Sequence, residues 1–303
     1  MRRIRSAIVT GATGAIGTAL CRLLSAKGVD VFAVVRPGSP RNERLKDVTV
    51  VTCDLRELKQ LPSCHADAFF HLAWMGTTGA DRNDMSLQVE NIRSALDAVH
   101  AAANMGCKTF IGAGSQAEYG RHNVPLTPKT ACFPETGYGM AKLCAGQMSR
   151  VECEKLGVDH IWARILSVYG PYDGEKAMIP QVIQQLLAGK KPSLTSGEQL
   201  WDYLYADDAA EALFLMALYG RNSAIYPLGS GQARALRTYI EILRDSIDPS
   251  LPLGFGEVPY GDTQVMHLEA DISALCKDTG FEPRTDYETG IRKTIDWTRR
   301  QHG

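Results

Sequence analysis

Two side chains in the middle of the sequence have the types and the spacing for acid-base chemistry. Tyr138 and Lys142 stand four residues apart in a stretch with a helical pattern, so they would share one face of a helix. An ammonium group beside a phenol favours the ionised phenol, which otherwise forms only at about pH 10. Such tuning would make Tyr138 a usable acid or base near neutral pH. The alternative is an ordinary helix surface, since a Tyr-Lys pair at this spacing often arises by chance.

A glycine-rich turn near the start of the chain has the pattern of a phosphate site. Gly11, Gly14 and Gly17 follow an apolar run at residues 7–9 and lead directly into a helical pattern at residues 15–26. Glycines here would permit a tight turn and close approach of the backbone to a pyrophosphate, while the helix N-terminus supplies free N–H groups. Such turns also close ordinary loops. The position between a buried strand and a helix favours dinucleotide binding.

The end of the second apolar run, residues 31–35, indicates which dinucleotide is bound. Folds that prefer NAD usually place an acidic residue here for the ribose hydroxyl, but this run ends at Arg36, with Arg41 and Arg44 nearby. Arginines can pair with a 2'-phosphate, so we expect NADP, with NAD as the alternative if the arginines form a solvated loop. Asp54, after the third run, is placed to meet the adenine, although an aspartate at a strand end is also a common turn former.

The first half of the chain alternates short apolar runs with helical patterns, which predicts an α/β fold with a Rossmann-type, doubly wound parallel sheet. The expected strands are residues 7–9, 31–35, 48–52, 68–72 and 109–111, and the expected helices between them include residues 15–26 and 87–105. The fifth strand leads into residues 112–120, which include Ser115 and Gln116. Ligands bind at the carboxyl ends of strands in such sheets, so this segment is expected at the site.

The second half has looser patterns and loops rich in glycine and proline, which predict a smaller C-terminal substrate-binding lobe. We assign residues 1–167 to an NADP-binding Rossmann domain. Residues 168–303 would form mainly the substrate lobe, with a segment at about residues 200–230 returning to the Rossmann domain.

Composition places the chain among soluble globular proteins. Its apolar fraction is 45%, its charged fraction 22% and its net charge −1, so neither disorder nor a nucleic-acid partner is expected. The apolar run at the start is too short for a membrane span. Eight scattered cysteines without a CxxC pair favour thiols in a reducing, cytoplasmic compartment. The histidines lack ligand spacing, so no metal site is expected.

The motifs taken together resemble the extended short-chain dehydrogenase/reductases of the NAD(P)-dependent epimerase/dehydratase type, from about residue 5 to the C-terminus. They are the Thr10 to Gly17 turn, Asp54-Leu55, His71-Leu72-Ala73, Asn91, Ser115, Tyr119-Gly120, Tyr138-x-x-x-Lys142, residues 164–171, residues 205–210 and residues 228–231.

This resemblance implies a role for each matching residue. Tyr138 would be the catalytic acid or base, Lys142 would hold the nicotinamide ribose and tune Tyr138, and Ser115 would hydrogen-bond the reacting oxygen. The further cofactor-binding positions would be Gly11, Thr13, Gly14, Ala15, Ile16, Gly17, Arg36, Asp54, Leu55, Leu72, Ala73 and Asn91. The substrate would meet Trp74, Ser115, Gln116, Tyr138, Met178 and Trp201. The helices at residues 87–105 and 138–155 would pair across a two-fold axis in a homodimer, unless both simply pack on the sheet.

The resemblance also narrows the reaction. Dehydratases of this family carry an acidic pair directly after the Ser or Thr, where this chain has Gln116 and Ala117, and Glu118 is offset by one residue. Dehydration is therefore not expected. Reduction or epimerisation at one carbon is left, and the NADP preference favours a nucleotide-sugar 4-ketoreductase that makes deoxysugars over an NAD-dependent epimerase.

Two departures from the family pattern concern the substrate. Trp201 stands where relatives carry an arginine that clamps the diphosphate, and a second arginine expected at residues 259–262 is missing. Lys176, Lys190, Lys191, Arg234 or Arg237 could replace these arginines. The alternatives are a smaller carbonyl substrate, with Trp74 and Trp201 as pocket walls or core residues, and an NADP-sensing protein without catalysis.

Overall fold

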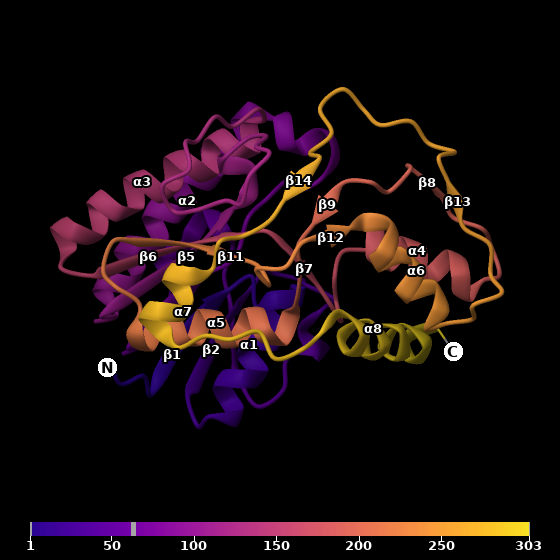
Figure 1. Cartoon of the computed structure of the whole chain (residues 1–303). Helices are drawn as coiled ribbons and strands as arrows, with labels where there is room; N and C mark the ends of the chain where they lie inside the picture. The colour runs from indigo at the N-terminus through magenta and orange to yellow at the C-terminus, as the bar shows by residue number, and fades with distance from the viewer. Residues whose placement is uncertain (1, 62–64, 303) are drawn as a thin grey trace.

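The computed structural model describes residues 2–61 and 65–302 and contains one large parallel sheet (Figure 1). Its strand order is β11-β6-β5-β4-β1-β2-β3, and every neighbouring pair is parallel. The prediction of a Rossmann-type sheet is confirmed. The strands are β1 (Ser6–Thr10), β2 (Asp30–Val35), β3 (Thr49–Thr52), β4 (Ala68–His71), β5 (Thr109–Ser115), β6 (Asp159–Ile165) and β11 (Ala224–Leu228).

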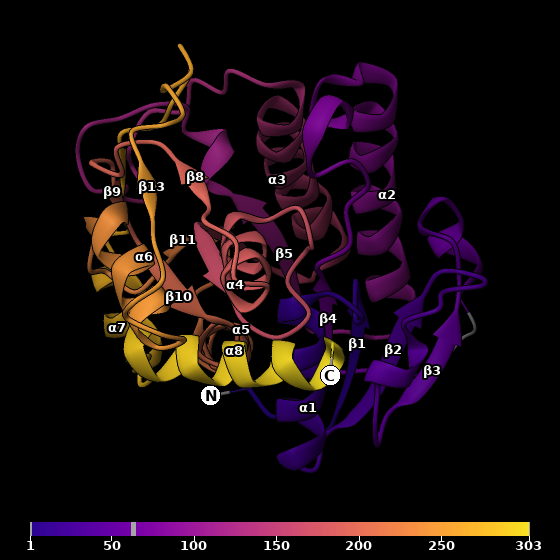
Figure 2. The same cartoon turned by 90° about the vertical axis from the view of Figure 1, so that its right-hand side faces the viewer.

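Helices cover both faces of the sheet because its strands are apolar on both sides. In β1, Ala7 and Val9 pack into one core cluster and Ile8 packs into another, as the alternation of side chains along a strand requires. The first face carries α1 (Ala15–Ala26), α5 (Ala206–Tyr219) and α7 (Ser273–Thr279). The second carries α2 (Met85–Asn104) and α3 (Gly137–Leu156), which lie side by side (Figure 2).

Strand β5 is longer than the predicted strand at residues 109–111, because its glycines are strand residues rather than turn residues. Gly112 pairs with Trp162 of β6. A Cβ atom at Gly112 would lie 2.2 Å from the Trp162 ring, and one at Gly114 would lie 2.4 Å from its Nε1 atom. The two glycines therefore make room for the indole, and the strand runs on to Ser115.

The second lobe packs three helices around a cluster rich in tyrosine and leucine. These helices are α4 (Met178–Leu187), α6 (Leu236–Asp245) and α8 (Tyr287–His302). Short strands connect them: β7 (Ser167–Tyr169) pairs with β10 (Tyr203–Tyr205), β8 (Ser193–Leu194) pairs with β13 (Gly254–Phe255), and β9 (Leu200–Trp201) lies between β12 (Arg234–Ala235) and β14 (His267–Leu268).

The chain returns to the large sheet between these segments, as α5 and β11. The assignment of residues 168–303 to a substrate lobe stays a prediction. None of the helices in the described ranges has the length and apolar character that a membrane crossing requires. Burial raises the pKa of the Cys21 and Cys153 thiols to about 12, and Cys64 lies outside the described residues.

Candidate active site

The turn after β1 has the geometry of a backbone cradle. Gly11 has φ +70°, and a Cβ atom there would lie 2.8 Å from the backbone nitrogen of Ala73. A Cβ atom at Gly17 would lie 2.1 Å from the carbonyl oxygen of Gly11, so both positions exclude a side chain. Helix α1 begins after Gly14 with no side-chain cap and no acidic residue in its first turn. Its N-terminal N–H groups and partial positive charge are therefore suited to an anion.

A cavity of about 660 Å³ opens beside this turn at the carboxyl ends of β1, β2 and β4. The predicted cofactor residues that line it are Gly11, Thr13, Gly14, Arg36, Asp54, Leu55, Leu72 and Ala73. Ala15, Ile16 and Gly17 form the start of α1 behind the turn. Asn91 is buried and acts on the loop after β4, because its amide group binds both the backbone N–H and the carbonyl of Met75 at 2.8 and 2.9 Å.

The three arginines expected near a 2'-phosphate have different surroundings. Arg36 and Arg41 are exposed side chains on the cavity wall. Arg44, at the end of the short helix η1 (Asn42–Arg44), instead donates to the Thr13 carbonyl at 2.9 Å and lies 4.7 Å from the Tyr172 ring centroid. Arg44 is thus engaged between the turn and Tyr172, and its pairing with a 2'-phosphate stays a prediction.

The Asp54 side chain, expected at the adenine, also caps a helix. It accepts a hydrogen bond from the backbone N–H of Arg56 at 2.9 Å, at the start of η2 (Leu55–Gln60). Asp54 therefore both lines the cavity and forms the turn.

Ser115 and Tyr138 come together where β5 ends and α3 begins. Ser115 is the last residue of β5 and caps η4 (Gln116–Glu118), where its Oγ accepts from the Ala117 N–H at 3.2 Å. Tyr138 is the second residue of α3, whose first turn is capped by Thr136. The Tyr138 phenol is buried, and the Ser115 side chain acts to lower its pKa. The structure thus brings Ser115 and Tyr138 to the same end of the sheet, and their catalytic roles stay predictions.

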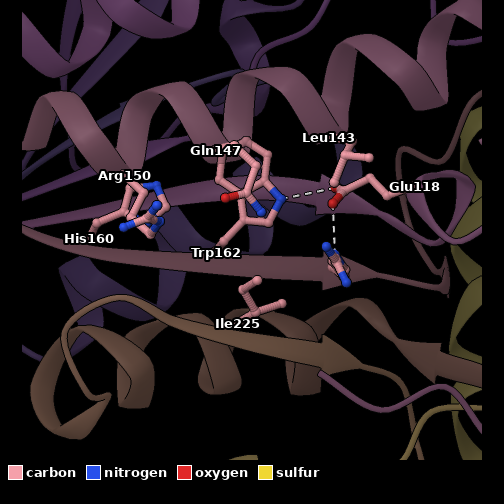
Figure 3. Close-up of a pocket in the computed structure, with 9 residues that line it drawn as sticks. Glu118, Leu143, Gln147, Arg150, His160, Trp162 and Ile225 are labelled. Carbon is pink, nitrogen blue, oxygen red and sulfur yellow. Dashed lines mark hydrogen bonds and ion pairs between the residues drawn. The ribbon is translucent and has the colours of Figure 1, made fainter. Parts of the chain in front are cut away.

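Glu118 holds this junction in place (Figure 3). Its carboxylate is fully buried and accepts hydrogen bonds from the Ser115 N–H at 2.8 Å, the Trp162 indole at 2.9 Å and the Arg164 guanidinium at 2.7 Å. The guanidinium also stacks 4.4 Å from the Tyr119 ring centroid. Glu118 is therefore an ion-pair partner that orients Ser115.

Lys142 lies farther from the phenol than its spacing predicts. Its Nζ atom donates to the Ala113 carbonyl at 2.6 Å and lies 3.8 Å from the Trp74 ring centroid, but 5.8 Å from that of Tyr138. Burial lowers the pKa of Lys142 to about 7, although the Glu118 carboxylate acts in the opposite direction. The ammonium is thus held by a carbonyl and an indole.

That Lys142 lowers the pKa of Tyr138 stays a prediction, and the influences seen on the phenol come from other groups. Burial raises the pKa of Tyr138, and the opposing influences are the hydrogen bond with Ser115 and the charge of Arg82. The Arg82 guanidinium lies 4.4 Å from the Tyr138 ring centroid. Sequence reasoning missed Arg82, because it lies in an irregular segment 56 residues before Tyr138 and shares no periodic pattern with it.

The residues expected on the substrate side are dispersed. Trp74 meets Tyr138 edge to face, with ring centroids 6.1 Å apart, and Gln116 follows Ser115. Met178 begins α4, and both Met178 and Trp201 pack against the core of the second lobe. The Trp201 indole donates to the Ser167 hydroxyl at 2.8 Å, so its polar side-chain atom has a partner.

Most of the basic residues proposed to replace the missing clamp are already engaged. Lys191 pairs with Glu257, and Arg234 pairs with Glu288 at 2.9 Å. Arg237 donates to the Ser196 carbonyl at 3.0 Å. Lys176 and Lys190 line a separate, open hollow of about 530 Å³ on α4. Across residues 2–61 and 65–302, no group of three His, Cys, Asp or Glu side chains is arranged to hold a metal ion.

Known proteins share this architecture. The profile of the NAD dependent epimerase/dehydratase family matches residues 7–229. CDP-abequose synthase of Salmonella typhimurium is 26% identical over 95% of this chain and 96% of its own. For dTDP-glucose 4,6-dehydratase of Escherichia coli, 27% identical over 57% of this chain, the chain spans about half the relative's length (50%). A UDP-N-acetylglucosamine 4-epimerase from Methanobrevibacter ruminantium M1, solved with UDP-N-acetylmuramic acid, superposes with a TM-score of 0.88 at 25% identity, covering 99% of this chain and 100% of the epimerase.

The low pKa of Lys142 predicts a pH dependence of stability in the ligand-free protein. Between about pH 7 and about pH 10 the unfolded chain keeps a proton on this amine that the folded chain has lost, so the free energy of unfolding should rise with pH, by up to about 1.4 kcal/mol per pH unit. Lys142→Met should remove this contribution in urea unfolding between about pH 7 and about pH 9. Lys155→Met, at an exposed position of α3, is the control. Equal slopes for the wild type and Lys142→Met would contradict the assignment.

Proposed function

Because the chain belongs to the NAD dependent epimerase/dehydratase family, we propose that it is an oxidoreductase of nucleotide-linked deoxysugars, of the 4-ketoreductase type. The observation that carries this proposal is the buried Tyr138 phenol at the start of α3, on which the Ser115 side chain at the carboxyl end of β5 acts to lower the pKa. An acid and an oxygen-binding hydroxyl thus stand together at the sheet edge where such folds bind ligands.

The described residues fit a dinucleotide. Gly11 and Gly17 form a cradle that a Cβ atom would fill, and the uncapped start of α1 supplies N–H groups for a pyrophosphate. The adjoining cavity of about 660 Å³, bordered by Arg36 and Asp54, would receive the adenosine half. A nicotinamide dinucleotide, when bound, supplies or accepts the hydride.

Side chains of the protein carry out the proton transfer. In the reductive direction the carbonyl carbon gains a hydride, and its oxygen takes the proton of the Tyr138 hydroxyl. The Ser115 hydroxyl donates a hydrogen bond to that oxygen as negative charge develops on it. The Glu118 carboxylate fixes the backbone N–H of Ser115 at 2.8 Å, so this hydroxyl is positioned before the substrate arrives.

Two features favour reduction over dehydration. Gln116 and Ala117 are not acids, and the nearby Glu118 carboxylate is engaged by Arg164 at 2.7 Å. CDP-abequose synthase also aligns with nearly the whole chain, whereas the dehydratase match covers 57% of it. Epimerisation at the same carbon is the second candidate, supported by the superposition on a UDP-N-acetylglucosamine 4-epimerase.

We further propose that NADP is the preferred dinucleotide. Arg36 and Arg41 both border the cavity beyond the end of β2, where an NAD-specific site would place a carboxylate. Guanidinium groups pair with phosphate in a charge-assisted, bidentate manner.

A homodimer through α2 and α3 is also proposed. On α3, Met140 and Met148 are 51% and 44% exposed, and on α2, Met85 and Val89 are 56% and 57% exposed. The two helices lie side by side (Figure 2), and each carries two of these exposed apolar side chains. A self-complementary apolar face of this kind suits a second copy of the chain.

The proposed acid is tested by Tyr138→Phe. Loss of the phenol oxygen should lower turnover of a 4-keto sugar linked to CDP, dTDP, UDP or GDP by roughly 10²- to 10⁴-fold while NADPH affinity stays nearly unchanged. Tyr226→Phe, which removes a phenol oxygen from β11, is the control. Full turnover in Tyr138→Phe would refute the role. If the wild-type protein binds none of the four nucleotide sugars, a smaller carbonyl compound is the expected substrate. If it binds NADPH but reduces no carbonyl compound, the expected function is that of an NADP sensor.

The cofactor proposal is tested by titrating NADPH and NADH against nicotinamide fluorescence. The wild type should bind NADPH more tightly, and Arg36→Glu should weaken NADPH by at least about tenfold, because a charge-assisted pair contributes about 1.4 kcal/mol or more. Arg3→Glu, an exposed change of the same charge, should change neither affinity. Tighter binding of NADH by the wild type would overturn the preference.

The dimer proposal is tested by sedimentation velocity. Met148→Asp should shift the protein from dimer to monomer, since it places a carboxylate in an apolar interface. Val258→Asp changes a side chain of similar exposure, 41%, in the second lobe and should leave the dimer intact. A wild-type monomer at micromolar concentration would exclude this interface.

A further inference from the structure

The segment between β4 and α2 places two side chains around the Tyr138 phenol. The Arg82 guanidinium lies 4.4 Å from the centroid of the phenol ring. Trp74 meets the same ring edge to face, with an interplanar angle of 87°. Arg82 belongs to the short helix η3 (Gly79–Asn83), and Trp74 follows β4 by three residues.

One buried amide supports both of these side chains. Gln88 of α2 is 2% exposed, and its Oε1 atom accepts a hydrogen bond from the Trp74 indole at 2.9 Å. Its Nε2 atom donates to the carbonyls of Gly76 at 3.1 Å and Asp81 at 2.9 Å, on either side of the turn that leads to Arg82. The backbone that carries Arg82 is thus fixed relative to Trp74.

Arg82 is also restrained directly. Its Nη1 atom donates to the Thr77 carbonyl at 3.1 Å. The next residue, Asn83, accepts a hydrogen bond from the Gly137 N–H at 3.0 Å, one residue before Tyr138. The arginine segment and the start of α3 are therefore fastened together, which keeps the guanidinium opposite the phenol.

Three charged groups surround Tyr138, and they differ in their partners. Lys142, one turn along α3, is 5.8 Å from the ring centroid and is engaged by a carbonyl and by Trp74. Glu118 of η4 disfavours the tyrosinate, but Arg164 balances its charge. Arg82 of η3 is the nearer cation, and within the ranges that the structure describes no carboxylate forms an ion pair with it. Its charge is thus left to act on the phenol.

We propose that Arg82 is a positioning residue that stabilises the tyrosinate form of Tyr138, a role that the spacing of the sequence had assigned to Lys142 alone. A cation over an aromatic face is attracted by the ring, and the attraction grows when the ring carries the charge of a phenolate. The inference rests on the proposed function only in taking Tyr138 as the acid or base of the reaction.

The direct test is a titration that needs no substrate. Tyrosinate absorbance is measured against pH, and the curve of Tyr138→Phe is subtracted to isolate Tyr138. Arg82→Met, which keeps the length of the chain and removes the charge, should move this titration upward by about one pH unit. Arg82→Lys should retain much of the effect, and Arg93→Met, exposed on α2, should show none. A shift with Lys142→Met and none with Arg82→Met would overturn the proposal.

The second readout is the pH profile of kcat/KM in the oxidative direction, in which the tyrosinate accepts the substrate's hydroxyl proton. Arg82→Met should displace the acidic limb of the profile upward by the same amount as the titration. A uniform loss of activity at all pH values would indicate a structural role, and a raised KM with an unmoved profile would indicate a substrate contact; either result would refute the proposal. If no nucleotide sugar is turned over, the proposed function is refuted. The absorbance titration still tests the role of Arg82, because it needs no substrate.

Discussion

The geometry of the site depends on one buried carboxylate. Glu118 receives hydrogen bonds from Ser115, Trp162 and Arg164, and so connects the end of β5 to the neighbouring strand β6. A buried charge is tolerated only when it is paired and fully hydrogen-bonded, and here every donor comes from an element that borders the site. Three glycines make room for the Trp162 indole: Gly112 and Gly114 of β5 and Gly146 of α3. A Cβ atom at any of these positions would overlap the indole ring. The helix that carries Tyr138 can therefore approach the sheet closely.

Burial has opposite effects on the two groups first identified in the sequence. It raises the pKa of the Tyr138 phenol and lowers that of the Lys142 amine, so each neutral form is favoured. Near neutral pH the phenol therefore keeps its proton, while the Lys142 amine is close to the middle of its titration. Burial acts most strongly on the phenol, and Ser115 and the charge of Arg82 act against it.

Sequence patterns predicted the sheet and the glycine turn, because these follow from local periodicity, whereas the joint roles of Ser115 and Tyr138 came from the resemblance to a family. The resemblance to extended short-chain dehydrogenase/reductases is confirmed by the family match. Patterns misjudged the length of β5, since glycines that accommodate an indole look like glycines of a turn. Patterns also could not place Arg82 and Arg44. The Arg44 guanidinium is held by the carbonyl of Thr13, which is distant in the sequence, and that of Arg82 by the carbonyl of Thr77, which lies in an irregular segment.

The amide of Gln88 connects the large cavity with the segment that lies beside the Tyr138 phenol. Trp74, Gly76 and Asp81 all line the large cavity, and all three are hydrogen-bonded to this amide, which also fixes the backbone leading to the phenol's neighbour. If the dinucleotide proposed for the cavity shifts this segment, and Arg82 acts on the phenol as proposed, its binding must change the proton affinity of the phenol. By reciprocity, ionisation of the phenol must then change the affinity for the dinucleotide by the same factor. Occupancy of the cavity and readiness for proton transfer would then be two measurements of one coupling free energy.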